Sequence, residues 1–290
     1  MGERADRRRT VAALAFTLLV WGSAFVGLRE CLRAFSPGHL ALLRLAAACL
    51  TYLVIAPPTR LRPPGRKDWP AVIVVGILAT MVYHVLLNYA LVSVTAGSAS
   101  MVTNTAPIWA TVLAAILLKE QVTARAWMGL CVSMAGVVLI SVGEGHGLRF
   151  SRGIWLLTGA AAAWGLNIVL QKPLMRRCSP LQVSAYSVWA GSLGLLAFLP
   201  GIVEAVRHAP VSALLWVAYL GAVPLALAYV TWAYVLAHLP AAAASRWLFL
   251  IPVIATIIGW PVLGEVPSPT AMCGGAIAIL GVAIGATGRR

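Results

Sequence analysis

Residues 107–136 and 252–281 are two versions of one stretch, PIWATVLAAILLKEQVTARAWMGLCVSMAG and PVIATIIGWPVLGEVPSPTAMCGGAIAILG. A proline, a glutamate and two glycines coincide between them at an offset of 145 residues. Such a duplication in an apolar chain predicts two like units that pack face to face. Further pairs at offsets of 143 to 145 residues are Tyr89 with Tyr234, Trp21-Gly22 with Trp164-Gly165, and Ser36-Pro37 with Ser179-Pro180.

Composition predicts that the chain lies in a membrane. Of its 290 residues, 61% are hydrophobic and 10% are charged, and the mean hydropathy is +0.89. A soluble domain carries about 25% charged residues. The first apolar run, Thr10–Leu28, follows a basic start as in a signal peptide, but its length predicts a retained membrane helix. The predicted fold class is therefore an all-α polytopic membrane protein.

Proline, glycine and charge clusters divide the chain into ten predicted membrane helices, five in each repeat. An odd number of crossings makes the second repeat enter from the opposite side, so the repeats are predicted to be inverted about an axis in the membrane plane. The predicted helices are 10–28, 39–56, 71–94, 97–118, 126–142, 153–170, 181–199, 211–237, 241–263 and 270–287. The predicted organisation is a cytoplasmic tail (1–9), a first repeat (10–143), an outer linker (144–152) and a second repeat (153–288).

The distribution of basic residues predicts an orientation. With the N-terminus in the cytoplasm, the inner segments hold 15 of the 22 Lys and Arg residues and the outer loops hold 5. This bias predicts that both termini are cytoplasmic in a multi-pass protein of the cell (inner) membrane. The same bias accounts for the net charge of +14, so no nucleic-acid partner is expected. The expected partners are the lipid bilayer and a small-molecule substrate.

The repeated landmarks form an ordered set of short motifs. In the two repeats they are Trp21-Gly22-Ser23-Ala24-Phe25, Arg44, Pro107, Glu120, Gly129 and Gly136, and Trp164-Gly165-Leu166-Asn167, Pro252, Glu265, Gly274 and Gly281. This set resembles the two EamA domains of the drug/metabolite transporter superfamily over nearly the whole chain. The resemblance implies a ten-helix secondary transporter, in many members an exporter of amino acids or other small metabolites. It also implies a substrate cavity between the halves, lined mainly by the first, third and fourth helices of each repeat.

Acidic residues are absent from the middle of every predicted helix, since all eight fall at helix ends or in loops. Proton-coupled exporters of cationic drugs usually need a membrane carboxylate, so neutral, zwitterionic or anionic solutes are expected. An intramembrane enzyme would need a deep nucleophile with its base, paired carboxylates or metal ligands. The sequence offers one deep histidine, no H-E-x-x-H motif and no phosphate loop. The prediction is alternating-access transport without catalytic residue, metal or cofactor; a passive facilitator or channel is the alternative.

Polar side chains within the predicted helices each have two interpretations. Arg246 either anchors a substrate carboxylate or reaches the inner interface. Arg44 is interpreted first as structural, bonding backbone carbonyls, and second as a substrate contact. His84 can titrate near neutral pH, so it either couples transport to protons or bonds two helices. The amides with the same choice between helix contact and substrate ligand are Asn88, Asn104 and Asn167.

Trp21 and Trp164 are the aromatic residues most favoured as cavity walls, because they are repeat-related and each precedes a glycine that lets a helix approach. Pro107 and Pro252 lie in the middle of matching spans and are predicted to kink them and act as hinges. Further aromatic candidates for the cavity are Trp109, Tyr229 and Trp247.

Two features are predicted to be structural. Glu120 and Glu265 end matching helices and are expected to hold the tight turn to the next one. The fifth helix of each repeat carries small residues spaced by three and four, which let helices pack backbone to backbone. These helices are expected to pack on each other in a monomer or on a second protomer in a homodimer. Their small residues are Gly129, Ser133, Gly136, Gly274, Ala278, Gly281 and Gly285.

Overall fold

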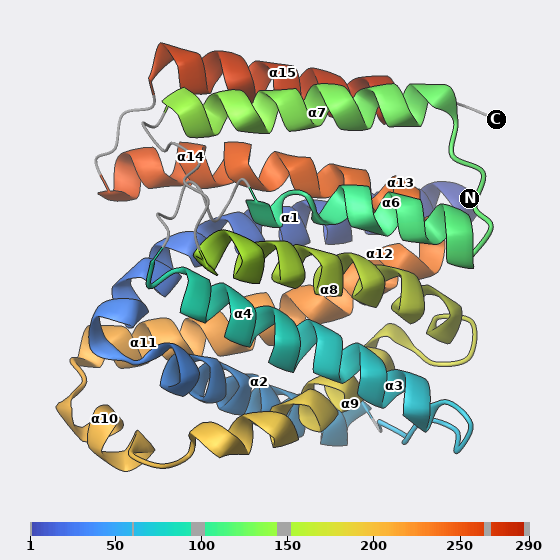
Figure 1. Cartoon of the computed structure of the whole chain (residues 1–290). Coiled ribbons are helices and arrows are strands. Elements are labelled where there is room, and N and C mark those ends of the chain that lie inside the picture. The colour runs from blue at the N-terminus through green and yellow to red at the C-terminus, as the bar shows by residue number, and fades with distance from the viewer. Residues whose placement is uncertain (1, 60, 94–101, 144–151, 264–267, 287–290) are drawn as a thin grey trace.

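The protein is a bundle of helices (Figure 1). The computed structural model describes residues 2–59, 61–93, 102–143, 152–263 and 268–286, and every regular element in these ranges is helical. Five of the described helical segments are apolar and long enough to cross a bilayer, and shorter apolar helices accompany them. The prediction of an all-α polytopic membrane fold is confirmed.

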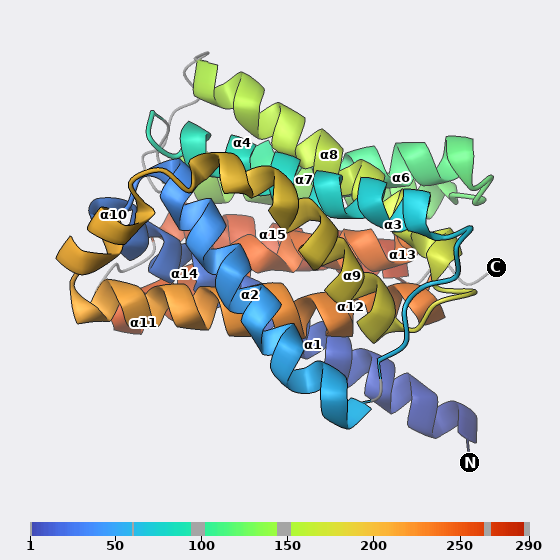
Figure 2. The ribbon, with the colours of Figure 1, turned by 90° about the horizontal axis from the view of Figure 1, so that it is seen from below.

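The helices follow the ten predicted spans in order. Helix α1 begins at Gly2, so the basic start of the chain continues the first helix, and its N-terminal end projects from the bundle (Figure 2). In the first repeat the elements are α1 (Gly2–Ala34), α2 (Pro37–Thr59), α3 (Trp69–Gly76), η1 (Ile77–Val82), α4 (Tyr83–Ala90), α6 (Ala106–Leu117) and α7 (Ala124–Gly143).

The second repeat has the same plan. Its elements are α8 (Arg152–Leu174), α9 (Pro180–Leu193), η2 (Gly194–Phe198), α11 (Val211–Leu220), η3 (Gly221–Leu227), α12 (Ala228–His238), α13 (Ala241–Ser245), η4 (Arg246–Phe249), α14 (Leu250–Leu263) and α15 (Pro269–Ala286). A short helix that was not predicted, α10 (Ile202–His208), lies between η2 and α11. Local signals set the starts of helices: at α9, Ser179 and Gln182 form a reciprocal capping box and Pro180 follows the cap.

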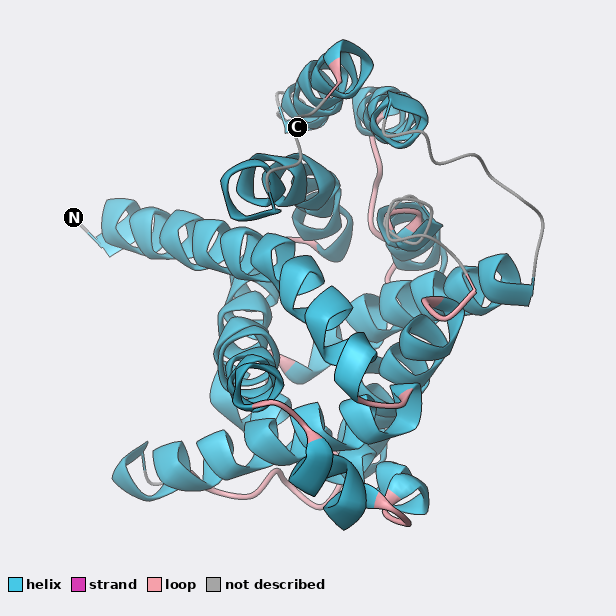
Figure 3. Ribbon diagram, turned by 90° about the vertical axis from the view of Figure 1, so that its left-hand side faces the viewer, coloured by secondary structure: helices cyan, strands magenta, loops and turns pink. Residues whose placement is uncertain are grey.

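Helices α7 and α15, the last of each repeat, pack side by side, at the top in Figures 1 and 3. A Cβ atom on Gly129 would lie 2.6 Å from Gly281 O, and one on Gly136 would meet Gly274 O and Ala278 N. Rising numbers on α7 therefore meet falling numbers on α15, so these equivalent helices are antiparallel. The repeats are inverted, as predicted, and the two small-residue faces pack on each other.

The pseudo-two-fold axis also shows in contacts that occur twice. A side chain on Gly76 would meet Ser187 O, and one on Gly221 would meet Arg44 O. Gly76 and Gly221 are repeat-equivalent, as are Arg44 and Ser187. Each repeat therefore packs the glycine of its third crossing against the second helix of the other repeat.

The third crossing of each repeat contains a turn of π-helix, η1 in the first repeat and η3 in the second. A π-turn leaves carbonyl groups outside the regular α-helical pattern and is frequent at functional sites. Side chains of the opposite repeat bond to these carbonyls: Tyr229 Oη donates to Ala79 O (3.2 Å), and Trp21 Nε1 donates to Pro224 O (3.0 Å). The two π-turns therefore join the repeats at their axis.

The fourth crossing of each repeat is broken near its proline. In the first repeat a turn at Asn104–Thr105 precedes α6, and Pro107 lies in the first turn of that helix. In the second repeat the 3₁₀ segment η4 precedes α14, and Pro252 lies in its first turn. The sequence placed both prolines inside continuous helices, whereas the structure places them where a new α-helix starts, a position that tolerates the missing N–H group. Whether these breaks act as hinges stays a prediction.

Candidate functional site

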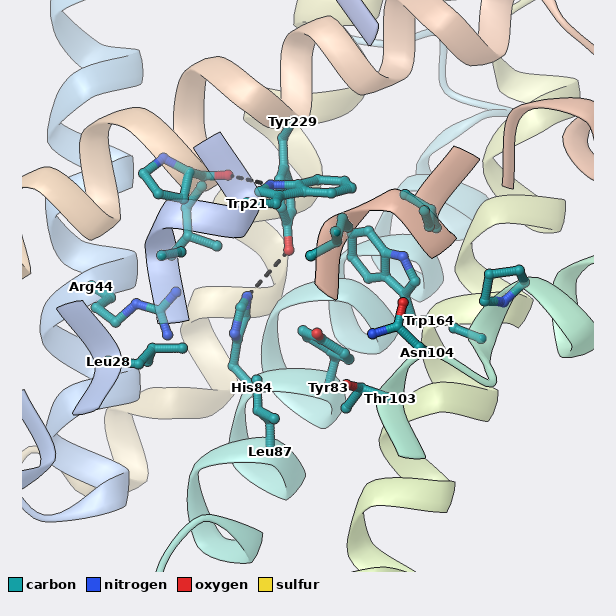
Figure 4. Close-up of a pocket in the computed structure, with 17 residues that line it drawn as sticks. Trp21, Leu28, Arg44, Tyr83, His84, Leu87, Thr103, Asn104, Trp164 and Tyr229 are labelled. Atoms are coloured by element: carbon teal, nitrogen blue, oxygen red, sulfur yellow. Dashed lines mark hydrogen bonds between the residues drawn. The ribbon is translucent and has the colours of Figure 1, made fainter. Parts of the chain in front are cut away.

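A cavity of about 90 Å³ lies at the axis between the two repeats. Its walls come from the first, third and fourth crossings of each repeat, joined by one residue of α2 (Figure 4). A cavity of this size holds several water molecules or a small solute, because one water needs about 10–15 Å³. The lining residues are Trp21, Ala24, Leu28, Arg44, Tyr83, His84, Leu87, Thr103, Asn104, Ala106, Pro107, Trp164, Pro224, Leu225, Tyr229, Leu248 and Ile251.

Aromatic rings form one wall of this cavity. The Trp21 and Trp164 rings, which the repeat relates, lie edge to face with their centroids 5.3 Å apart. Tyr229 lies 5.6 Å from Trp164, and Tyr83 lies 5.1 Å from the same indole. Rings at these separations attract each other and offer an apolar surface with a polarised face. Trp21 and Trp164, which the sequence favours as cavity walls, both lie in the lining of this cavity, and their role toward a substrate stays a prediction.

His84 and Tyr229 meet across the axis at equivalent positions of the two repeats. His84 Nε2 lies 3.2 Å from Tyr229 Oη, and that hydroxyl, which has a single proton, lies 3.2 Å from Ala79 O. With the hydroxyl proton directed at Ala79 O, His84 Nε2–H donates to Tyr229 and Nδ1 of the neutral ring is an acceptor; with the proton directed at His84, the tautomer is reversed. His84 Nδ1 is buried and has no hydrogen-bond partner among the described residues.

Arg44 lines the cavity from α2 with 3% of its surface exposed. Its Nε and Nη1 atoms have no hydrogen-bond partner among the described residues. The bonds to backbone carbonyls that the sequence suggested are therefore absent at these two atoms. None of the ion pairs among the described residues involves Arg44. Because an uncompensated buried charge is expensive, this cation at the cavity wall would be stabilised by an anion.

No carboxylate is among the described cavity residues. The acidic groups with a described ionic partner lie elsewhere: Asp68 pairs with Arg177 at 3.2 Å, Glu30 with Arg33 at 2.9 Å and Glu204 with His208 at 3.2 Å. The cavity therefore has a positive and aromatic lining, which suits a carboxylate better than a cationic solute.

Four of the other predicted site residues lie outside the cavity lining. Asn88 donates through Nδ2 to Pro37 O (3.0 Å), which ties α4 to the start of α2. Trp109 is 39% exposed on the bundle surface. Asn167 is buried in α8 outside the cavity lining, and Trp247 packs in a core cluster with Phe249. Asn104 lies in the lining, with Pro107 close by.

Arg246, the cation that the sequence considered as a substrate anchor, is half-buried and not among the cavity residues. Its Nη1 atom lies 3.2 Å from the position of a Cβ on Gly285, near the C-terminal end of α15. A cation at a helix C-terminus interacts favourably with the helix dipole. This contact places Arg246 against α15 rather than in the described cavity, and its position at the membrane interface stays a prediction.

Glu120 bonds to a different segment from the one the sequence suggested. Its carboxylate accepts from Ala241 N (2.9 Å) and Ala242 N (3.1 Å) at the start of α13 in the other repeat. The free N–H groups of a helix start attract a carboxylate more strongly than the turn after its own helix does. The neighbouring Lys172 donates to Leu239 O (2.6 Å) at the end of α12. Glu265 lies outside the described residues.

Sequence reasoning did not select several lining residues as site candidates. Tyr83 and Pro224 had detectable signals, because one neighbours His84 and the other is a proline within an apolar run. Thr103 and Leu248 gave none, since small polar and aliphatic residues occur throughout membrane helices. Their place in the lining follows from the breaks in the fourth crossings.

The inverted repeats and the cavity at their axis define a polytopic membrane protein of the kind built from paired helical repeats. The chain belongs to the EamA-like transporter family, whose profile matches residues 9–142 and 151–286. It is therefore a multi-pass membrane protein of a transporter family, and its relatives point to a non-enzymatic function.

Two relatives that carry transporter names are similar to this chain over nearly its whole length. It is 36% identical to a "Probable terminal-alkyne amino-acid exporter" of Streptantibioticus cattleyicolor, over 94% of this chain and 92% of that one. It is 34% identical to the "Uncharacterized transporter YdfC" of Bacillus subtilis, over 95% of this chain and 91% of that one. A protein crystal structure shares the fold with a TM-score of 0.77 at 20% identity, over 95% of each chain.

Proposed function

We propose that this protein is a secondary-active exporter of small metabolites such as amino acids or related neutral, zwitterionic or anionic solutes. The observation that carries the proposal is the cavity between inverted repeats, lined by matching helices of both. The exporter name of the Streptantibioticus cattleyicolor relative supports the direction and the substrate class.

Alternating access is the proposed mechanism. In inverted repeats, the two halves can exchange conformations, which opens the cavity to one side and then to the other. The broken fourth crossings, at Asn104–Thr105 and at η4, supply matching positions where backbone angles can change. The π-turns η1 and η3 accept hydrogen bonds from side chains of the opposite repeat, so a rearrangement of one repeat changes these contacts with the other.

Transport is tested with purified protein in liposomes. Vesicles loaded with millimolar unlabelled amino acid should accumulate the same labelled amino acid by counterflow, with saturation and without ATP. Empty liposomes are the control, and a pH gradient of either sign tests proton coupling. Linear, unsaturable flux without counterflow would make the protein a passive facilitator or channel, and no flux from a panel of amino acids and related carboxylates would contradict the proposal.

The proposed topology has both termini in the cytoplasm. The start of α1 and the end of α15 lie at the same end of the bundle, on the right in Figure 1, and basic residues concentrate in the segments assigned to that side. Epitope tags at either terminus should be cut by protease in inside-out membrane vesicles and protected in intact spheroplasts. The reverse pattern would invert the assignment.

A further inference from the structure

We propose that the cavity recognises the head group of an α-amino acid, with the Arg44 guanidinium binding the carboxylate and neutral His84 accepting a hydrogen bond from the amino group. This inference rests on the proposed transport function and narrows its substrate class. Both side chains line the same cavity (Figure 4), and each carries buried polar atoms without a described partner.

The Arg44 half of the proposal follows from charge. Arg44 lines the cavity, its buried Nε and Nη1 atoms have no hydrogen-bond partner among the described residues, and no described lining residue is acidic. Guanidinium donors form a planar fork that matches a carboxylate, and such charge-assisted pairs are the strong hydrogen bonds. A carboxylate that enters the cavity would therefore supply the negative charge that no described lining residue gives to Arg44.

The His84 half follows from hydrogen-bond direction. With the Tyr229 hydroxyl proton directed at Ala79 O, His84 Nε2–H donates to Tyr229 and the buried Nδ1, which has no partner among the described residues, is the acceptor; the proposal takes this tautomer. An arginine that only donates and a histidine nitrogen that only accepts complement a group that has both an acceptor and a donor. A carboxylate with an amino group on the adjacent carbon is such a group.

The remaining lining is suited to an apolar substrate side chain. Trp21, Trp164 and Tyr83 offer ring faces, and Leu248 and Ile251 add aliphatic surface. Ring faces also attract an ammonium group. The head-group residues come from the first repeat alone, because the second repeat has Ser187 and Tyr229 at the positions of Arg44 and His84. One orientation of the substrate is therefore expected.

The proposal is tested on the detergent-purified full chain with three ligands of equal chain length. Norleucine has both groups, hexanoate has the carboxylate alone, and norleucinamide has the amine without a carboxylate. Thermal stabilisation should rank norleucine first and hexanoate second, with norleucinamide at least about tenfold weaker than norleucine, the loss expected from one charge-assisted bond. Equal or tighter binding of norleucinamide would overturn the proposal. So would the absence of any shift from norleucine and from each of the twenty amino acids.

Variants of Arg44 and His84 then test which residue binds the carboxylate and which binds the amino group. Arg44→Gln should remove the preference for norleucine over norleucinamide, Arg44→Lys should keep part of it, and Arg246→Gln, the other arginine within a predicted span, should leave it unchanged. His84→Phe should equalise norleucine and hexanoate. A carboxylate preference that survives in folded Arg44→Gln, or is lost in Arg246→Gln, contradicts the assignment.

Binding and counterflow together separate the head-group site from the transport function. Binding with these preferences but no counterflow would refute transport and leave the head-group site standing. Counterflow that takes norleucinamide equally would refute the site and leave transport standing.

Discussion

The pseudo-two-fold axis passes through two regions that differ in chemistry. At the α7–α15 contact, equivalent residues Ser133 and Ala278 meet, and the Ser133 hydroxyl donates to Ala278 O at 3.2 Å. At the cavity, equivalent residues His84 and Tyr229 meet, but their side chains have diverged and His84 Nδ1 is unbonded. The first region keeps the symmetry because close packing needs small residues on both sides. The second loses it, as the proposed binding of a ligand without two-fold symmetry would require.

Trp164→Ala should have the largest effect, because it removes a buried ring from the cavity wall. We expect a loss of about 3–5 kcal/mol in stability, the usual cost of deleting a buried aromatic side chain, and loss of counterflow. The matched control is Trp155→Ala on the same helix, where the indole is 69% exposed. Circular dichroism melting and counterflow measure the two effects. Equal losses in both variants would mean that the cavity wall is no more important than the outer surface.

Gly136→Ala should damage the symmetric contact between α7 and α15. The new Cβ would meet backbone atoms of Gly274 and Ala278, which cannot move like a flexible side chain. Overpacking of this kind costs about 1–3 kcal/mol. Gly275→Ala is the control, since its Cβ would lie 3.7 Å from the nearest atom, Val253 Cγ1. Thermal unfolding of the two variants compares them directly, and an unaffected Gly136→Ala would argue against the close approach.

Glu120→Gln tests a cross-repeat contact that belongs to neither region. The carboxylate accepts from Ala241 N and Ala242 N, whereas the Gln amide has a single acceptor oxygen, so one bond to the start of α13 is lost and the other becomes neutral, with an expected loss of about 1 kcal/mol. Glu204→Gln at the surface of α10 should be neutral. Chemical unfolding in detergent measures both. If Glu204→Gln lost as much stability as Glu120→Gln, the carboxylate cap on α13 would contribute no more to stability than a surface ion pair.

Trp109→Phe should have the smallest effect. The side chain is 39% exposed and outside the cavity lining, so we expect a change below about 0.5 kcal/mol in stability and unaltered counterflow. A clear loss of counterflow with normal folding would show that the functional cavity extends along α6 from Pro107 to Trp109.

The choice between the two intramembrane arginines shows where sequence reasoning reaches its limit. Both Arg44 and Arg246 are cations in apolar runs, and their patterns do not distinguish a cavity from an interface. The structure separates them because burial depends on which helices surround each side chain: α2 turns Arg44 toward the axis, whereas η4 places Arg246 beside Gly285. The sequence likewise did not predict the π-turns, because their residues are as apolar as those of the α-helices around them.

The sequence by itself determined the membrane class, the ten spans, the duplication and its inversion, and the presence of a small-residue face on the last helix of each repeat; the structure decided that these two faces pack on each other. Those properties depend on hydropathy, on the parity of crossings and on the absence of side chains at fixed intervals, all of which are local or periodic. Only the tertiary structure decided that Arg44 and His84 share a cavity, that Glu120 caps the opposite repeat, and that each fourth crossing breaks before its proline. These depend on contacts between residues far apart in the chain, where the hydrogen-bond partner of a buried group is set by the neighbouring helix.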